Sequence, residues 1–275
     1  MDEVFIGSEA LAGGALTRGR LRWNFQAFFP DVYASKDATL SLSLRIIGAW
    51  LWSGRRGVIA GLAAAALHGA RWVDDSADIE MIFRSGRSPS GIVVRNERIE
   101  SDEIVEIEGL PVTTPERTAL DLARHAPRDV AVPHLDALAR ATRITFADVQ
   151  PLVDRYRGAR DLCRAIVALD LMDGGSFSPK ETVVRLALID AGFPAPRTQF
   201  LVGDGTRVAL IAMGYLPPKV GVDFGTGQTE FLERAGWKLI PTCDAPNKHL
   251  VVYHVRAAVI KRGYPLWKLR RLSRR

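Results

Sequence analysis

Apolar and polar positions near the start of the chain predict two short helices followed by a β-hairpin. Ser8 can cap the first helix, and a glycine pair ends it. Thr17 precedes the second helix, over residues 18–23, and the aromatic segment 25–35 predicts two strands around a Pro-Asp turn. This order of elements is typical of a winged helix-turn-helix, and the alternative is an ordinary helical hairpin beside a strand pair.

The stretch over residues 38–172 mixes helices with short strands. Residues 38–72 predict two helices, of which the second, over 57–72, is a run of small residues. Strand patterns then occupy residues 77–85, 91–99 and 103–114. A helix begins with Pro115 at its first position, and further helices fill residues 133–172.

Two polar features of this stretch are interpreted as structural. His68 lies on the small-residue face and is expected at a helix end or in the core. Arg117 and Asp121 are spaced i, i+4 on one helix, where they can form an ion pair. We therefore assign these side chains to the architecture of the protein rather than to its chemistry.

A break in the pattern at residues 173–176, with the sequence DGGS, predicts a domain boundary. After it, Ser178 and Glu181 fit a capping box at the start of a helix. Residues 249–263 predict a closing helix despite their β-branched content. Strand patterns between these two helices occupy residues 198–202, 207–213, 219–224 and 236–242.

The composition is that of a soluble globular protein with room for two modest domains. The chain has 275 residues, of which 47% are hydrophobic and 25% charged, and it contains no run of 18 apolar residues. Its acidic start lacks the basic region of a secretory signal. Cys163 and Cys243 lie far apart and outside any zinc-ligand spacing, so we expect a cytoplasmic protein with no membrane partner, disulfide or structural zinc.

Positive charge is concentrated in two places. The formal net charge is +6, and Arg18, Arg20 and Arg22 fall within the second short helix, while the tail from Lys268 onward contains cations and no acid. Clustered cations suit a polyanionic partner such as DNA, and a solvated basic face is the alternative. Thr17 is included as a phosphate ligand at a helix N-terminus. The candidate DNA-binding residues are Thr17, Arg18, Arg20, Arg22, Lys36, Lys268, Arg270 and Arg271.

Several stretches together resemble a family found in actinobacteria. They include FIGSEALAGGALTRGRLR, GVIAGLAAAALHGA, PVTTPERTALDL and SPKETVVRLALIDAGFP. Members of this family join a winged-helix, AbiEi-antitoxin-like region to a domain similar to the very-short-patch-repair endonucleases, of the PD-(D/E)XK type. The resemblance implies an α+β chain with a winged helix-turn-helix at residues 1–37. A mixed α/β and helical AbiEi-like region would follow at 38–172, and a restriction-endonuclease-like α/β domain at 173–275.

The resemblance also implies that the last domain has lost its metal site. In active-looking relatives, a helix glutamate and acids on two adjacent strands hold Mg²⁺, which activates water against the scissile phosphate. Here Glu181, Asp223 and Gln228 match that pattern as vestiges of it. Ala212 and Gly225, however, stand where acids are expected.

Two further losses separate the chain from those relatives. Thr229 replaces the histidine of a Gln-His pair, and the basic helix that follows the pair is missing from the sequence. We therefore expect no catalytic residue, no metal ligand and no cofactor.

The expected function is that of a DNA-binding protein, an antitoxin-like or transcriptional regulator with a catalytically dead nuclease-like domain. Its expected partners are double-stranded DNA and, in addition, a cognate toxin or a second copy of the chain. The first alternative is a metal-dependent DNA endonuclease that uses Mg²⁺ in a rearranged active site. The second alternative is a protein-interaction scaffold.

Overall fold

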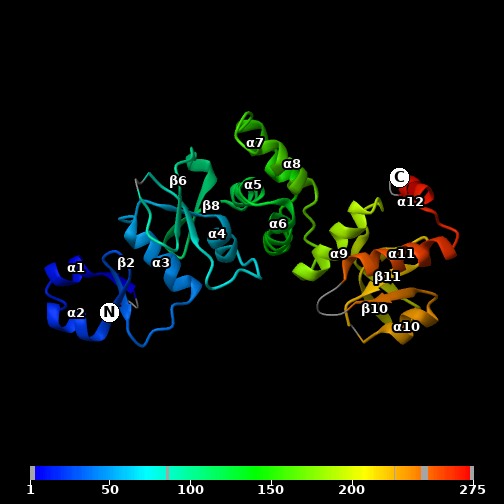
Figure 1. Ribbon diagram of the computed structural model, residues 1–275, viewed down its shortest axis with the longest axis horizontal. Helices are drawn as coiled ribbons and strands as arrows, with labels where there is room; N and C mark the ends of the chain where they lie inside the picture. Colours follow the sequence, from blue (N-terminus) through cyan, green and yellow to red (C-terminus); the bar gives the residue numbers. More distant parts are fainter. Residues whose placement is uncertain (1–3, 85–86, 226, 243–246, 273–275) are drawn as a thin grey trace. The chain divides into compact units, whose positions relative to one another are not determined.

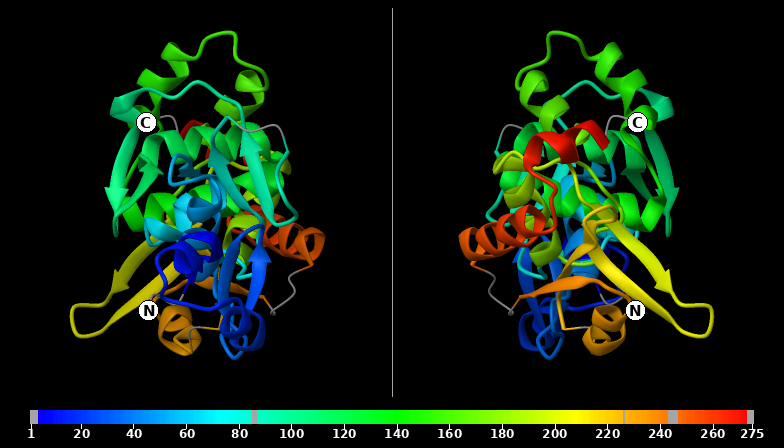
Figure 2. Two further views of the ribbon diagram at one scale, coloured as in Figure 1. Left: turned by 90° about the vertical axis from the view of Figure 1, so that its left-hand side faces the viewer. Right: turned by 90° about the vertical axis from the view of Figure 1, so that its right-hand side faces the viewer.

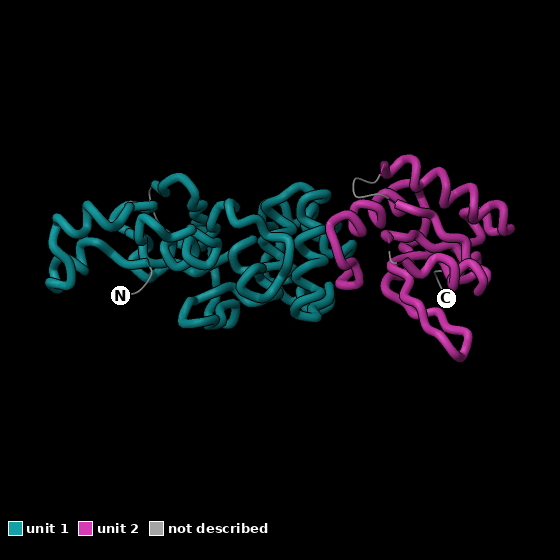
Figure 3. Tube along the Cα trace, turned by 90° about the horizontal axis from the view of Figure 1, so that it is seen from below, with its two compact units in different colours: residues 1–172 teal, residues 173–275 magenta. Residues whose placement is uncertain are grey.

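The computed structural model describes residues 4–84, 87–225, 227–242 and 247–272, the side chains of 270–272 excepted. It divides into two compact units, Met1–Met172 and Asp173–Arg275 (Figure 3). Helices and strands alternate in both, and the described strands form three sheets. The chain is therefore of mixed α+β class.

The first unit opens with two short helices enclosed by strands. Strand β1 spans Val4–Ile6, and helices α1 and α2 span Gly7–Ala12 and Arg18–Asn24. Strands β2 and β3, over Phe25–Phe29 and Val32–Ser35, form the expected hairpin, and the antiparallel sheet has the order β1-β3-β2.

The residues at the starts of the two helices of this segment behave differently. Thr17, which precedes α2 as expected, also caps it, because its side chain accepts a hydrogen bond from the Arg20 N–H. Ser8, in contrast, lies inside α1, and the expectation that it caps this helix was wrong. Its N–H and hydroxyl both donate to the carboxylate of Asp31 in the hairpin turn, at 3.0 and 2.5 Å. The side chain thus ties α1 to the hairpin.

A mixed five-stranded sheet follows helix α3, Leu42–Trp52, and has the order β6-β5-β4-β8-β7. Helix α4 spans Gly61–Leu67, and the turn η1 spans Ser101–Glu103. The strands β4 to β8 span Val58–Ala60, Ile79–Ile82, Ile92–Arg95, Ile104–Ile107 and Leu110–Thr113.

The prediction of an unbroken helix over residues 57–72 was wrong, because Val58–Ala60 is the central strand β4. This strand is buried between β5 and β8, an environment that favours its β-branched residues. The chain then enters α4 without a loop, and Gly61 makes the reversal with φ +57°. His68 lies at the end of α4, as expected, with Nε2 2.7 Å from the Thr113 carbonyl.

The N-terminal segment shares its core with the five-stranded sheet. Strands β1 and β3 pack on α3, and α3 packs in turn on β4 and β5. The segment over residues 1–37 is therefore built onto the rest of the unit by continuous apolar packing. The buried residues of this common core include Val4, Phe29, Val32, Ala34, Ile46, Ala49, Ile59, Ile79 and Met81.

Four helices complete the first unit (Figure 1). Helix α5 packs against all three others and against α4, and is buried along most of its length. Helix α6 begins at Arg128, five residues earlier than expected, and includes Pro133. The bounds of α5 to α8 are Pro115–His125, Arg128–Thr142, Phe146–Arg155 and Leu162–Asp170.

The second unit is a four-stranded sheet of order β12-β11-β10-β9, in which only the pair β11 and β12 is parallel. Its strands β9 to β12 span Arg197–Gly203, Val208–Tyr215, Val220–Asp223 and Lys238–Pro241. Strands β9 and β10 form a long hairpin, drawn in yellow in Figure 2. Its helices α9 to α12 span Pro179–Asp190, Thr229–Arg234, Lys248–Lys261 and Leu266–Leu272.

Helices α9 and α11 share one apolar core with this sheet, and α10 shares a second core with Trp237 and Phe200. Ser178 caps α9 as expected. Helix α10 follows β11, but it has only six residues, with two glutamates and one arginine, so it is not the basic helix that the resemblance places after the Gln-His pair. The element order of the unit is thus α9, three antiparallel strands, α10 and a parallel strand.

We predict that Gly61→Ala destabilises the first unit far more than Gly109→Ala does. Both glycines have positive φ, +57° and +77°, so each substitution costs roughly 1 kcal/mol of backbone strain. A Cβ at Gly61 would also lie 2.4 Å from Glu80 Oε1 and 3.0 Å from its Cβ, whereas open space surrounds that of Gly109. Urea unfolding at neutral pH should show an additional loss of about 2 kcal/mol at Gly61, and equal losses would contradict the role of the β4–α4 reversal.

Candidate nucleic-acid interface

Helix α2 places its three arginines in solvent. Leu21 is the buried residue that anchors the helix, and Arg18, Arg20 and Arg22 are all exposed. Within the described parts of the chain, none of the three guanidinium groups has an ion-pair or hydrogen-bond partner. Three unpaired cations on one short helix favour a polyanionic partner.

The outermost face of α2 contains an aromatic residue that the sequence reasoning missed. At 100° per residue, Gly19 and Trp23 lie opposite the buried Leu21, with Arg20 on one side of them and Arg22 on the other. The Trp23 side chain is 76% exposed. Plotting the predicted helix around its axis would have identified this face, because Leu21 is the only aliphatic residue in it.

Both ends of α2 are held in place by polar contacts. Thr17 caps the start, and at the other end the N–H of Lys36 donates to the Asn24 carbonyl at 3.0 Å. The Lys36 ammonium donates to the Arg22 carbonyl at 3.0 Å, where the negative end of the helix favours a cation. Thr17 and Lys36 therefore position α2, and a direct contact of either with DNA stays a prediction.

Helix α1 is joined to two neighbouring segments. Its Gly7 N–H donates to the Asp31 carbonyl in the hairpin turn at 2.8 Å. Glu9 forms a two-pronged ion pair with Arg55, beyond the end of α3, with both N–O distances 2.7 Å. The hydrogen bond from Arg55 lowers the pKa of the Glu9 carboxyl. The hairpin and the segment after α3 thus hold the two short helices in position.

The C-terminal candidates are described in part. Lys268 is exposed, but its ammonium donates to the Gly263 carbonyl at 3.2 Å and lies 4.4 Å from the centre of the Tyr264 ring. The side chains of Arg270 and Arg271 lie outside the described residues, so their contribution stays a prediction. Leu269, between Lys268 and Arg270, is buried in the core of the second unit.

The matched acids of the second unit take part in local hydrogen bonds. Glu181 is 7% exposed and accepts from the Phe177 N–H at 3.0 Å and from Gln199 Nε2 at 3.2 Å. Asp223 accepts from the Thr229 hydroxyl at 2.9 Å and from the Gly225 N–H at 3.0 Å. These bonds end β11 and begin α9.

The other matched position, Gln228, binds backbone rather than a ligand. Its side-chain oxygen accepts from the Leu210 N–H at 3.0 Å. Ala212, where the resemblance places an acid, is buried on β10. Among the described residues of the second unit, no three acidic, histidine or cysteine ligand atoms gather closely enough to hold a metal ion.

A dense charge network lies inside the first unit around Arg117, which is 1% exposed. Its Nε donates to Asp121, as the spacing predicted, at 2.9 Å, and its Nη1 donates to Glu103 at 2.5 Å and to the Tyr156 hydroxyl at 3.0 Å. The pKa of Arg117 lies above its ordinary value, although burial alone would lower it, because Asp121 and Glu103 stabilise the cation. Burial raises the pKa of Tyr156 to about 12.

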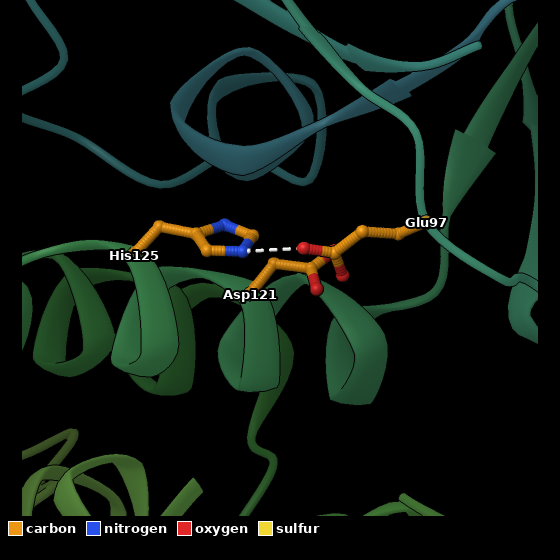
Figure 4. A group of neighbouring side chains, drawn as sticks. All are labelled: Glu97, Asp121 and His125. Atoms are coloured by element: carbon orange, nitrogen blue, oxygen red, sulfur yellow. Dashed lines mark hydrogen bonds and ion pairs between the residues drawn. The ribbon is translucent and has the colours of Figure 1, made fainter. Parts of the chain in front are cut away.

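One part of this network brings together Glu97, Asp121 and His125, with potential ligand atoms within 4.8 Å of one another (Figure 4). His125 Nε2 lies 2.8 Å from Glu97, and Arg124 Nη1 lies 2.7 Å from the same carboxylate. The bond to His125, and then Arg124, lowers the pKa of Glu97 to about 2. Folding therefore gains stability from Glu97 above pH 4.5, and loses it as the pH falls towards 2.

This cluster does not fit a metal ion. Arg117 and Arg124 already donate to the carboxylates that an ion would need, and two guanidinium groups would repel it. Burial raises the pKa of Asp121 to about 6, against the opposing effect of Arg117. The arrangement is that of an internal ion network that holds α5 against the segment after β6.

Comparison with known proteins gives a family match over part of the chain. Residues 58–171, from β4 to the end of α8, match the family model of the AbiEi antitoxin C-terminal domain. The uncharacterized proteins MT2308 and Rv2248 of Mycobacterium tuberculosis are each 25% identical over 226 residues, 76% of this chain and 82% of theirs. The crystal structure of the RV2827C protein from Mycobacterium tuberculosis is 20% identical, with a TM-score of 0.42, over 61% of this chain and 71% of its own.

Helix length and hydropathy bear on whether the chain could span a membrane. Within the described ranges, no helix is long and apolar enough to cross a bilayer.

We predict that Arg117→Met destabilises the first unit by about 3–5 kcal/mol, because it removes the hydrogen-bonded cation of the buried Asp121 and leaves Glu103 with Arg155 as its remaining ion-pair partner. Arg117→Lys should lose most of the same stability, since an ammonium cannot reach several partners at once. The matched control is Arg157→Ala, whose ion pair with Asp154 is exposed to solvent and contributes little to stability. Chemical unfolding of the three variants measures the difference, and a loss at Arg117 as small as that at Arg157 would contradict the network's role.

Proposed function

We propose that this protein is a DNA-binding regulator of the antitoxin type, which binds duplex DNA through α2. The observation that carries the proposal is the set of three unpaired arginines on an exposed, firmly held helix. The family match over residues 58–171 to the AbiEi antitoxin C-terminal domain supports the antitoxin part, because these residues and α2 belong to the same unit. A cognate toxin is then the second partner class, and a cytoplasmic location stays a prediction.

The surroundings of α2 support a winged helix-turn-helix as the binding module. Helix α1, a glycine-containing turn and α2 are followed at once by the β2–β3 hairpin. In such modules the second helix enters the major groove, and the flanking segments contact the backbone. Gly19 has no side chain to hold the helix away from DNA, so Trp23 and the flanking arginines can approach base edges and phosphates.

The first test of this proposal replaces Arg18, Arg20 and Arg22 with Ala together. The triple variant should bind duplex DNA more weakly, and the slope of log affinity against log salt should fall by about one for each phosphate that an arginine no longer neutralises. Fluorescence anisotropy over a salt series measures both quantities. Trp23→Ala should weaken binding while leaving the salt slope unchanged, because the indole carries no charge.

The matched control removes three other exposed arginines of the first unit, Arg71, Arg157 and Arg160. It changes the net charge by the same amount, so it separates a specific interface from general charge attraction. Circular dichroism confirms that each variant is folded. Equal losses in the two triple variants, or no loss in the first, would rule out α2 as the DNA-binding element.

We further infer that the second unit is nuclease-like in form and inactive in chemistry. The order of one helix, three antiparallel strands, a helix and a parallel strand supports the resemblance to the PD-(D/E)XK type. The lost ligands at Ala212 and Gly225, and the local bonds of Glu181 and Asp223, support inactivity, because Mg²⁺ requires several free oxygen ligands. The unit then persists as a folded module without a metal.

The second test incubates the purified protein with supercoiled, mismatched and single-stranded DNA in Mg²⁺ and in Mn²⁺. No metal-dependent cleavage is expected, and Ala212→Asp alone should not restore it, because Gly225 and Thr229 still lack ligand groups. The matched control is Glu181→Ala with Asp223→Ala. Cleavage by the wild-type protein that disappears in this control would establish the endonuclease alternative.

A further inference from the structure

A pocket of about 580 Å³ opens in the first unit beside strands β4, β5 and β6. Three separate segments of chain contribute to it: the loop before β4, the end of β5 and the segment after β6. Its apolar wall includes Ile82 and Phe83. Its polar lining includes Arg56, Arg84, Asn96 and Arg98. No residue of α2 belongs to it, so the pocket is separate from the proposed DNA interface.

The arginines of this pocket carry positive charge that the protein itself leaves largely uncompensated. Arg56 lies over the Phe83 ring, 5.3 Å from its centre, and within the described residues neither Arg56 nor Arg84 has an ion-pair partner. Arg98 pairs with Glu100 at 2.5 Å, but its side chain is 72% exposed. Guanidinium groups gathered around one concavity repel one another, and a bound anion would relieve that repulsion.

The acid in the pocket wall does not cancel this charge. Glu97 is held by His125 at 2.8 Å and by Arg124 at 2.7 Å, within the internal network. Those bonds direct the carboxylate towards the network, where its negative charge is compensated by its bonding partners. The pocket therefore offers guanidinium donors next to an apolar wall, with Arg56 over the Phe83 ring.

We propose that this pocket binds a nucleoside triphosphate, with Arg56 and Arg84 on the phosphates and the base against the apolar wall. The volume falls within the range of about 300–1,000 Å³ that is typical of small-molecule sites. The planar fork of a guanidinium matches the oxygens of a phosphate group. Asn96 supplies a donor and an acceptor for base or sugar. A flat surface would suit a nucleic-acid backbone, whereas a concave site with an apolar wall favours a single nucleotide.

The test measures binding of ATP, GTP, CTP and UTP to the full chain by isothermal titration calorimetry. Separate titrations with inorganic triphosphate and with adenosine distinguish the contribution of the phosphates to binding affinity from that of the base. The variant Arg56→Ala with Arg84→Ala should lower nucleotide affinity at least about tenfold, since it removes two charge-assisted hydrogen-bonding groups. The matched control is Arg71→Ala with Arg160→Ala, which removes the same charge elsewhere and should leave affinity unchanged.

Both double variants alter exposed side chains, and thermal unfolding verifies that they fold like the wild type. No binding of any nucleotide at millimolar concentration would overturn the proposal, as would equal losses in the two double variants. Triphosphate binding as tight as that of the nucleotides would overturn the assignment of the base to the apolar wall. Loss of duplex affinity in the Arg56 and Arg84 variant, without nucleotide binding, would assign the arginines to the DNA backbone instead. That result is distinguishable from failure of the α2 interface, which is tested with its own variants.

Discussion

The ion network of Arg117 is the interaction on which the first unit depends. One guanidinium group, 1% exposed, joins α5 to Glu103 at the end of η1 and to Tyr156 beyond α7. Taking these charges out of water is costly, and only near-complete hydrogen bonding makes the burial tolerable. The network therefore restricts α5 to one position against the sheet. Because α4, α6, α7 and α8 all pack on α5, that restriction extends to the helical half of the unit.

The same residue type has the opposite environment at the surface of the unit. Arg117 and Arg124 are buried and engaged by carboxylates, whereas the arginines of α2 and the pocket arginines Arg56 and Arg84 have no acidic partner among the described residues. Net charge alone does not distinguish these groups, since the chain as a whole is only mildly basic. The distribution of acids does distinguish them. Acids pair with the interior arginines and leave two surface regions positive. The interior arginines therefore stabilise the fold, and the surface arginines are available to bind anions.

Local signals in the sequence predicted local structure well. The cap at Ser178, the β2–β3 hairpin and the Arg117–Asp121 pair depend on residues a few positions apart. Strand β4 could not be predicted in this way, because its neighbours β5 and β8 come from later in the chain, and its Val-Ile-Ala run adjoins a strong helix former. Glu97, Glu103 and Tyr156 likewise reach Arg117 from distant positions.

The candidate sites follow the same division. The arginines of α2 are close in sequence and were found from it, whereas Trp23 required the orientation of the helix, which Leu21 sets by being buried. The pocket lined by Arg56, Arg84 and Arg98 combines three segments, and no spacing within one segment indicates it. Long-range β pairing created this concavity, so it could be recognised only after the sheet was known.

The positions of the second unit that the resemblance singles out are compatible with a stable fold without a metal. Carboxylates gathered for a metal repel one another when the metal is absent, so removing one of them relieves strain in the apoprotein. Ala212 is buried without an unsatisfied polar group, and Gly225 adopts φ +87°, which a glycine tolerates. The two acids that the resemblance matches, Glu181 and Asp223, bond to backbone N–H groups at the ends of α9 and β11. Their carboxylates thus stabilise the termini of the elements that they occupy, and neither of these bonds requires a metal.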